Sequence, residues 1–175
     1  GSIFKLVQAL TALQEGVIQP GSGFPCTKSL VGCHNHPTAT DVVHGIQYSC
    51  NPYFYQVFKR EIEQGHTPNR FKDAALGLAE WETYMLSFGL GQRPSVALPS
   101  AKGGRIPNEA YYDKRYGKEA WAFSTIYSVS IGQGEVEVVP MQMANLAATF
   151  ANRGWYIDPH IVTAVGHPDS LTRWE

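Results

Sequence analysis

Apolar side chains recur at the three- and four-residue spacing of helices along much of the chain. The segment SIFKLVQALTALQE, residues 2–15, carries apolar side chains at eight of its fourteen positions. A surface helix with a single apolar stripe has fewer. The pattern therefore predicts a helix that is buried nearly all round and that ends at Gly16 in the usual C-terminal manner.

The polar residues of this first helix lie on one narrow stripe, because they step along the sequence by three or four. They are Ser2, Lys5, Gln8, Thr11 and Glu15. Side chains at this spacing share one face of a helix. Ser2 and Lys5 are therefore expected to face the same way, one turn apart.

Four further helices follow from caps and periodicity. We expect one from a cap at Thr38 or Thr40 to about Cys50, one with Pro52 in its first turn and apolar positions Tyr53, Phe54, Val57, Phe58 and Ile62, one from Phe71 to about Phe88, and one from Pro140 that Gly154 closes. A helix after Pro107 is also predicted. The Gly- and Pro-rich composition of residues 90–108 predicts a long loop, and the alternation of apolar and polar residues in the tail 155–166 predicts a strand. The chain should be mostly helical, with one or two strands near its end.

Composition narrows the class of protein. The chain has 175 residues, of which 43% are hydrophobic and 17% charged, and this suits one globular domain with a sizeable core. A net charge of -1 gives no electrostatic reason to expect nucleic acid or an anionic membrane surface as a partner. No apolar run approaches the roughly 20 residues that span a bilayer. Small molecules and proteins remain as partners.

Ser2 and Lys5 are the first candidates for chemistry. A serine hydroxyl needs a neighbouring base before it acts as a nucleophile at neutral pH. Burial lowers the pKa of a lysine toward the neutral amine that could serve as this base. A helix N-terminus also favours the negative charge of the reacting serine. In the alternative interpretation, Ser2 only caps the helix and Lys5 extends into solvent.

Ser49 and Asn51 supply the second element. The hydroxyl could relay a proton between Lys5 and a leaving group, and the carboxamide could hold a substrate carbonyl or the lysine. The alternative is a turn before Pro52 that serves only local structure.

Four blocks, in this order, resemble penicillin-binding protein transpeptidases of the class B, elongation type. They are GSIFKLVQALTALQEGVI, YSCNPYFYQVF, ALPSAKGGRIPN and SIGQGEVEVVPMQMANLAATFANRG. The last block is more specific to this family than the short motifs Ser2-x-x-Lys5 and Ser49-x-Asn51. The resemblance implies the α+β fold of serine β-lactamases and DD-transpeptidases, with this chain supplying mostly the helical part.

The resemblance also implies an activity and a setting. Ser2 would be the acylated nucleophile, Lys5 its base, Ser49 the proton relay and Asn51 a contact to substrate and lysine. The implied partners are the D-Ala-D-Ala end of peptidoglycan stem peptides, β-lactam antibiotics and cell-wall elongation proteins. The implied location is the bacterial inner membrane, reached through a segment outside this chain, with the catalytic domain on the periplasmic side. No cofactor is required for this chemistry.

The family's third motif, Lys-Ser/Thr-Gly, is absent from these residues. Lys102-Gly103-Gly104 does not replace it, because the family's motif follows the IGQG block. We therefore expect residues 1–175 to be a partial transpeptidase domain without the C-terminal motif strand, the N-terminal anchor or the dimerisation regions. Such a fragment should be inactive by itself, since that strand supplies half of the oxyanion hole.

The loop before the second motif is rich in cysteine and histidine, at a spacing that suits a tetrahedral metal site. The candidates are Cys26, Cys33, His34, His36, His44 and Cys50. Some elongation-type enzymes carry a zinc site between the first and second motifs, so the resemblance implies a structural zinc on Cys26, Cys33, His36 and Cys50. In the alternative, the thiols are free and Cys50 packs as a small apolar residue.

Two other functions stay open. A serine β-lactamase or β-lactam sensor would use the same serine, although no Glu-x-x-Leu-Asn motif is present to supply a deacylating carboxylate. A zinc-stapled helical interaction module would show no catalysis.

Overall fold

The computed structural model describes residues 1–94, 99–162, 164–166 and 172–173. The chain divides into two compact units, which are described separately. The first combines Gly1–Met85 with Pro107–Val136, and the second combines Leu86–Ile106 with Glu137–Glu175. Every helix in the described part of the chain is too short or too polar to traverse a lipid bilayer.

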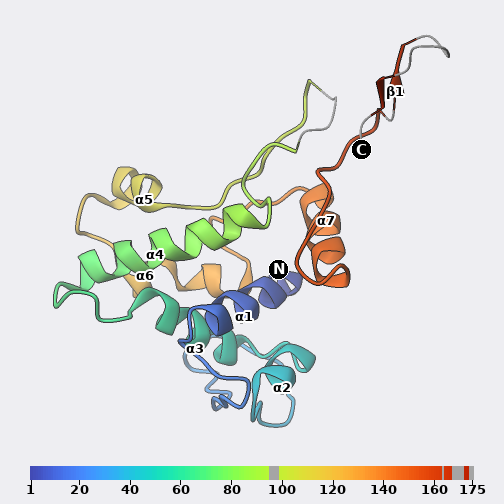
Figure 1. Cartoon of the computed structure of the whole chain (residues 1–175). Helices are drawn as coiled ribbons and strands as arrows, with labels where there is room; N and C mark the ends of the chain where they lie inside the picture. The colour runs from blue at the N-terminus through green and yellow to red at the C-terminus, as the bar shows by residue number, and fades with distance from the viewer. Residues whose placement is uncertain (95–98, 163, 167–171, 174–175) are drawn as a thin grey trace. The chain divides into compact units, whose positions relative to one another are not determined.

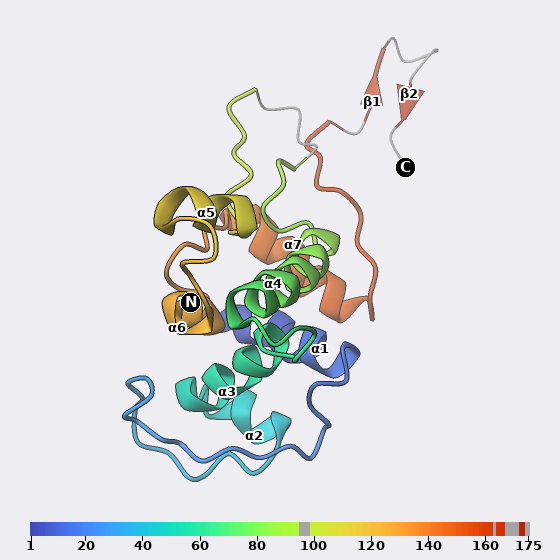
Figure 2. The ribbon, with the colours of Figure 1, turned by 90° about the vertical axis from the view of Figure 1, so that its left-hand side faces the viewer.

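The first unit holds most of the helices. They are the 3-10 turn η1 (Ser2–Phe4), α1 (Lys5–Gln14), α2 (Val42–Gln47), α3 (Asn51–Ile62), α4 (Arg70–Ser87), whose last residues enter the second unit, α5 (Glu109–Tyr116), α6 (Phe123–Ile126) and the 3-10 turn η2 (Tyr127–Ile131). The helices predicted around Pro52, from Phe71 and after Pro107 are confirmed as α3, α4 and α5. Both ribbon views show α1 beside α3, with α2 directly before α3 (Figures 1 and 2).

The core of the first unit forms where α1, α3 and α4 meet. The five apolar positions predicted for α3 are all fully buried: Tyr53, Phe54, Val57, Phe58 and Ile62. The buried ring of Trp81 on α4 lies 6.2 Å from that of Phe4 and 5.6 Å from that of Phe58. These large aromatic side chains stabilise the packing of the three helices, because each buries a large apolar area.

The predicted cap of α2 is wrong. Asp41 is the N-cap, and its Oδ1 accepts a hydrogen bond of 2.8 Å from the backbone N–H of His44. Thr38 and Thr40 lie before the cap, and the helix ends at Gln47, three residues before the predicted limit. An ionised aspartate complements the helix dipole better than a threonine does, and this favours the later start.

The prediction that the first helix is buried all round is also wrong. Ile3, Leu6 and Leu10 are 63%, 37% and 41% exposed, whereas the polar residues Lys5 and Thr11 are each 1% exposed. Lys5, Gln8 and Thr11 of the polar stripe therefore face the interior, whereas Ser2, expected to face the same way as Lys5, is exposed.

Hydrogen-bond partners on α3 and α4 explain why the polar stripe is the inward face. The indole Nε1 of Trp81 donates to Gln8 Oε1 at 2.9 Å, and the Thr11 hydroxyl lies 2.8 Å from Glu61 Oε1. Buried polar groups are tolerated where they find partners of this kind.

The second unit is built on α7 (Pro140–Ala151), which begins at the predicted proline. The buried Gln142 side chain joins several backbone segments of this unit by hydrogen bonds. Its Nε2 lies 2.7 Å from the Gly103 carbonyl and 2.8 Å from the Gln92 carbonyl, and its Oε1 accepts from the Val139 N–H. The described parts of the predicted loop 90–108 contain no helix, and one buried amide ties them to α7.

The tail departs from its prediction. Residues 155–162 are irregular, and the strands are β1 (Ala164–Val165) and β2 (Thr172–Arg173), an antiparallel pair with Ala164 opposite Arg173. Residue 163 lies outside the described residues. Trp155, Ile157 and Ile161 keep the alternation but are more than half exposed. Alternation alone does not form a strand without a partner strand and a core to cover.

The carboxyl group of Glu61, near the end of α3, is fully buried. Its Oε2 has no hydrogen-bond partner, and α4 approaches its backbone so closely that a Cβ at Gly77 would lie 2.5 Å from the Glu61 carbonyl oxygen. Burial, together with the charge of Glu15, raises the pKa of Glu61 well above its usual range. Burial and the charge of Glu80 raise the pKa of Glu15 to about 7.

We predict that the free energy of unfolding falls as the pH rises from about 4.3, the ordinary glutamate pKa, through 7. The folded state binds these protons more tightly than the unfolded state, so it loses stability where they dissociate. Glu61→Gln should weaken this dependence, measured as Tm between pH 5 and pH 8. Glu63→Gln, at the exposed residue that directly follows the same helix, should follow the wild type. Parallel curves for all three proteins would contradict the prediction.

Candidate active site

Two of the predicted site residues lie where α2 passes into α3, and one of them, Ser49, has an unusual backbone conformation. Ser49 has φ +49°, in the left-handed region. Its N–H donates to the Ile46 carbonyl at 2.9 Å, and the next N–H, of Cys50, donates to the Gly45 carbonyl at 3.1 Å. This pair of bonds is the Schellman ending of a helix, in which glycine usually occupies the position of Ser49. Asn51 then begins α3.

Lys5 on α1 points into this turn. Its Nζ lies 2.6 Å from the Ser49 carbonyl oxygen, 3.0 Å from Ser49 Oγ and 2.6 Å from Asn51 Oδ1. The aromatic ring of Phe54 lies 5.6 Å away. The structure thus brings together three of the four residues that the sequence singled out. Burial lowers the pKa of Lys5 to about 8, although the thiols of Cys33 and Cys50 act in the opposite direction.

Ser2 lies in η1, one turn before Lys5, with an exposed side chain. Within the described residues, no hydrogen bond joins its hydroxyl to Lys5, Ser49 or Asn51. Its turn packs against the IGQG segment. The Gly132 carbonyl accepts a 2.6 Å hydrogen bond from the nitrogen of Gly1, and a Cβ at Gly132 would lie 2.5 Å from Phe4 Cβ.

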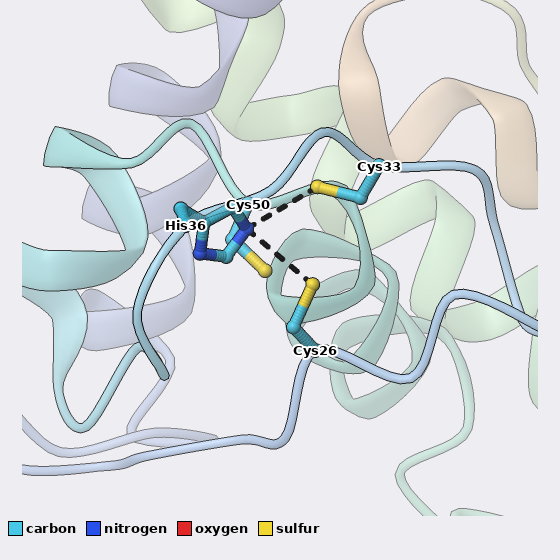
Figure 3. A group of neighbouring side chains, drawn as sticks. All are labelled: Cys26, Cys33, His36 and Cys50. Atoms are coloured by element: carbon cyan, nitrogen blue, oxygen red, sulfur yellow. Dashed lines mark hydrogen bonds between the residues drawn. The ribbon is translucent and has the colours of Figure 1, made fainter.

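A compact group of sulfur and nitrogen donors lies beside the same turn. The ligand atoms of Cys26, Cys33, His36 and Cys50 all fall within 4.8 Å of one another. Figure 3 shows these side chains pointing toward a common centre. The Nε2 of His36 is 3.3 Å from both Cys26 Sγ and Cys33 Sγ. His34 and His44 lie outside this group; the His44 ring pairs with Asp41 at 2.8 Å.

The environment of the group suits a metal. The Nδ1 of His36 lies 2.6 Å from the Pro37 carbonyl, and donation to that oxygen leaves Nε2 free as the ligand atom. Burial tends to raise the pKa of Cys33, but hydrogen bonds from the Asn51 N–H and from His36 lower it below the ordinary thiol value. Three thiols and one imidazole form a Cys3His set, which is a common structural zinc site.

Comparison with known proteins identifies the family. The profile of the penicillin-binding protein transpeptidase domain matches residues 1–173. The chain belongs to this transpeptidase family. The peptidoglycan D,D-transpeptidase MrdA of Acinetobacter baumannii is 29% identical over 174 residues, an alignment that covers 94% of this chain and 24% of that protein. The chain therefore spans about a quarter of this curated relative.

Solved structures show the same fold. Penicillin-binding protein 2 (PBP2) of Pseudomonas aeruginosa superimposes with a TM-score of 0.73 at 23% identity, over all of this chain and 40% of that one. PBP2 of Helicobacter pylori, solved in complex with MreC, gives 0.70 at 21% identity, over 91% of this chain and 28% of that one. The α+β transpeptidase fold expected from the sequence is confirmed, with this chain forming mostly helices.

Two residues have structural roles that were not predicted from the sequence. Gly132 and Gln142 both lie in the segment SIGQGEVEVVPMQMANLAATFANRG, which carried the family resemblance as a block. The glycine allows close approach to the turn of Ser2, and the glutamine joins three carbonyls of the second unit. The two glycines of the Ile131-Gly132-Gln133-Gly134 stretch were the available signal for the first. Nothing in the sequence pointed to the partners of the glutamine.

We predict that Ser49→Gly is more stable than Ser49→Ala by about 1 kcal/mol, because alanine keeps the cost of the left-handed conformation and glycine does not. Both variants lack the hydroxyl that contacts Lys5, so their difference isolates the backbone. Urea denaturation of the two variants would measure it. Equal free energies of unfolding would show that the turn relaxes to another conformation.

Proposed function

We propose that this chain carries the acylating residues of a class B peptidoglycan DD-transpeptidase that acts in cell-wall elongation. Ser2 is the nucleophile, Lys5 its general base, Ser49 the proton relay, and Asn51 holds the lysine and the substrate. The observation that carries the proposal is the buried Lys5 amine, held by the Ser49–Asn51 turn from 44 residues away. Family membership and the MrdA relative support the same reaction.

The chemistry proceeds in two steps. Neutral Lys5 takes the proton of the Ser2 hydroxyl as its oxygen bonds to the carbonyl carbon of the penultimate D-Ala. The peptide bond to the terminal D-Ala then breaks, and the departing amine receives a proton from Lys5 through the Ser49 hydroxyl. An amine of a neighbouring stem then attacks the carbonyl carbon of the acyl-enzyme, and its proton passes through the Ser49 hydroxyl to Lys5. The ester bond to Ser2 breaks, and Lys5 returns a proton to the Ser2 oxygen. β-Lactams form the same ester with Ser2.

The domain is proposed to continue beyond these residues. The chain spans a quarter of its relative and has no Lys-Ser/Thr-Gly triplet, so the strand that completes the oxyanion hole lies in a further segment. We place the anchor and dimerisation regions outside residues 1–175 as well. The enzyme would face the periplasm from the inner membrane and work with other elongation proteins. The complex of a similar PBP2 with MreC supports such a partner.

We predict that acylation by a fluorescent penicillin, measured in the full-length protein, accelerates as the pH rises through about 8, where half of the Lys5 amine is neutral, and levels off only above that pH. The rise follows deprotonation of Lys5, whose lowered pKa makes the neutral amine available. Lys5→Arg keeps the positive charge but cannot become neutral, so its acylation rate should fall by about 100-fold or more.

Ser2→Ala should abolish labelling and serves as the control for covalent attachment. A flat pH profile, or an arginine variant with the wild-type rate, would contradict the role of Lys5. Residues 1–175 alone should stay unlabelled, since the third motif is absent from them. Rapid turnover of a chromogenic cephalosporin by the full-length protein would instead favour a β-lactamase.

We also propose that Cys26, Cys33, His36 and Cys50 hold a structural zinc ion. The metal would fix the long connection between α1 and α2 against the start of α3. A tetrahedral zinc with bonds of about 2.0–2.3 Å needs donors roughly 3.5–3.8 Å apart, so the 3.3 Å contacts of His36 are close to the required spacing. All four residues stay outside the acyl-transfer steps.

We predict one zinc per chain by elemental analysis of the purified protein. Removal by a strong chelator should lower Tm by roughly 10 °C, because the site closes a long loop against a buried helix. His36→Ala should lose the metal, whereas His34→Ala, which changes the neighbouring exposed imidazole, should retain it. Metal-free protein with an unchanged Tm would contradict the proposal. Zinc-dependent folding without any penicillin adduct in the full-length protein would favour a non-catalytic interaction module.

A further inference from the structure

The connection between α1 and α2 makes two hydrogen bonds to Asn51. The backbone N–H of Asn51 donates to Cys33 Sγ at 3.4 Å, and its side-chain Nδ2 donates to the Gly32 carbonyl at 2.7 Å. Two adjacent residues of the loop therefore hold both the backbone and the side chain of this asparagine. Neither bond was anticipated from the sequence, since 18 and 19 residues separate the partners.

The bond to Gly32 fixes which end of the Asn51 carboxamide faces the lysine. The two ends of an asparagine amide have nearly the same shape, so hydrogen bonds alone decide its orientation. A backbone carbonyl can only accept, so Nδ2 must face Gly32 and Oδ1 must face away from it. Oδ1 is the atom that lies 2.6 Å from Lys5 Nζ.

The bond to Cys33 fixes the first residue of α3. The first N–H groups of a helix have no partner within the helix, and a side chain of the preceding residue usually caps them. Cys50, the N-cap here, makes no side-chain cap hydrogen bond. The Cys33 sulfur supplies an acceptor from a distant part of the chain instead.

Cys26 offers a contrast within the same donor group. Its Sγ contacts His36 at 3.3 Å, as the Cys33 sulfur does, and both side chains are partly buried. In the described part of the chain, however, Cys26 has no hydrogen bond to Lys5, Ser49 or Asn51. The two cysteines thus share the proposed ligand role and differ in their contact with the asparagine.

We propose that Cys33, together with the Gly32 carbonyl, is a positioning residue for Asn51, so that the cysteine loop sets the hydrogen-bond acceptor presented to the Lys5 amine. The inference rests on the proposed function of Lys5 and Asn51. It assigns Cys33 a second role that Cys26 does not share. Cys33 touches neither substrate nor reacting atoms and acts through the asparagine.

The test compares Cys33→Ala with Cys26→Ala in the full-length protein, with zinc content measured for each. Both substitutions remove one ligand, so loss of metal alone should affect them equally, and alanine leaves no acceptor for the Asn51 N–H. The rate of acylation by a fluorescent penicillin should fall about tenfold further in Cys33→Ala, the scale typical of groups that orient a functional side chain. Ser29→Ala, at an exposed position of the same loop, should keep the wild-type rate.

A double-mutant cycle with Asn51→Ala separates positioning from general damage. If Cys33 acts through Asn51, the excess effect of Cys33→Ala over Cys26→Ala disappears when Asn51 is already alanine. Equal rates for the two cysteine variants, or an excess that persists without Asn51, would overturn the inference.

Amide exchange gives a readout independent of activity. With asparagine-selective ¹⁵N labelling, the Asn51 backbone N–H should exchange faster in Cys33→Ala than in Cys26→Ala at matched zinc content. Equal exchange would overturn the positioning role even where acylation differs. Failure of the wild-type protein to react with penicillin would instead count against the proposed function, and the exchange result would still decide the contact between Cys33 and Asn51.

Discussion

The burial of the Lys5 amine is the constraint on which the rest of the site depends. An ammonium group that is almost wholly removed from water needs several acceptors, and the turn before α3 provides three of them within 3.0 Å. Two come from Ser49, whose left-handed backbone aims both its carbonyl and its hydroxyl at the amine. This conformation is energetically costly, and Ser49 keeps it because the contacts with Lys5 offset the cost.

Much of the fold follows from patterns that one element carries by itself. The spacing of Tyr53, Phe54, Val57, Phe58 and Ile62 identified the buried face of α3, and the prolines at 52 and 140 marked helix starts. Failures occurred where a partner from elsewhere decides the outcome. The α1 stripe turned inward because Trp81 and Glu61 offer hydrogen bonds. Residues 155–162 alternate but pair with no strand in the described part of the chain, and they are irregular.

The same distinction applies to the candidate site: local patterns predicted its residues, but not the contacts that distant parts of the chain make with them. The Ser2–Lys5 spacing could be predicted from one helical turn, Ser49 and Asn51 were candidates from their side-chain chemistry, and the family resemblance supplied the role of each residue. The route by which the cysteine loop reaches Asn51 could not be read, since its hydrogen bonds join Gly32 and Cys33 to a residue almost twenty positions later. Loop conformation depends on tertiary contacts that leave no periodic signal in the sequence. The gathering of Cys26, Cys33, His36 and Cys50 was expected only from the resemblance.

The inward stripe of α1 joins two buried ionisable groups of opposite type. Lys5 lies at its N-terminal end, and Thr11, two turns further on, meets the buried carboxyl of Glu61. Apolar side chains at these positions would pack without desolvation costs, so stability alone does not account for the stripe. The lysine end has a chemical use in the proposed reaction. The glutamate end has none there, yet it ties α1 to α3 close to where Gly77 lets α4 approach. Its hydrogen bond fixes the register of α1 against α3, and this register decides whether the Lys5 amine reaches the Ser49–Asn51 turn.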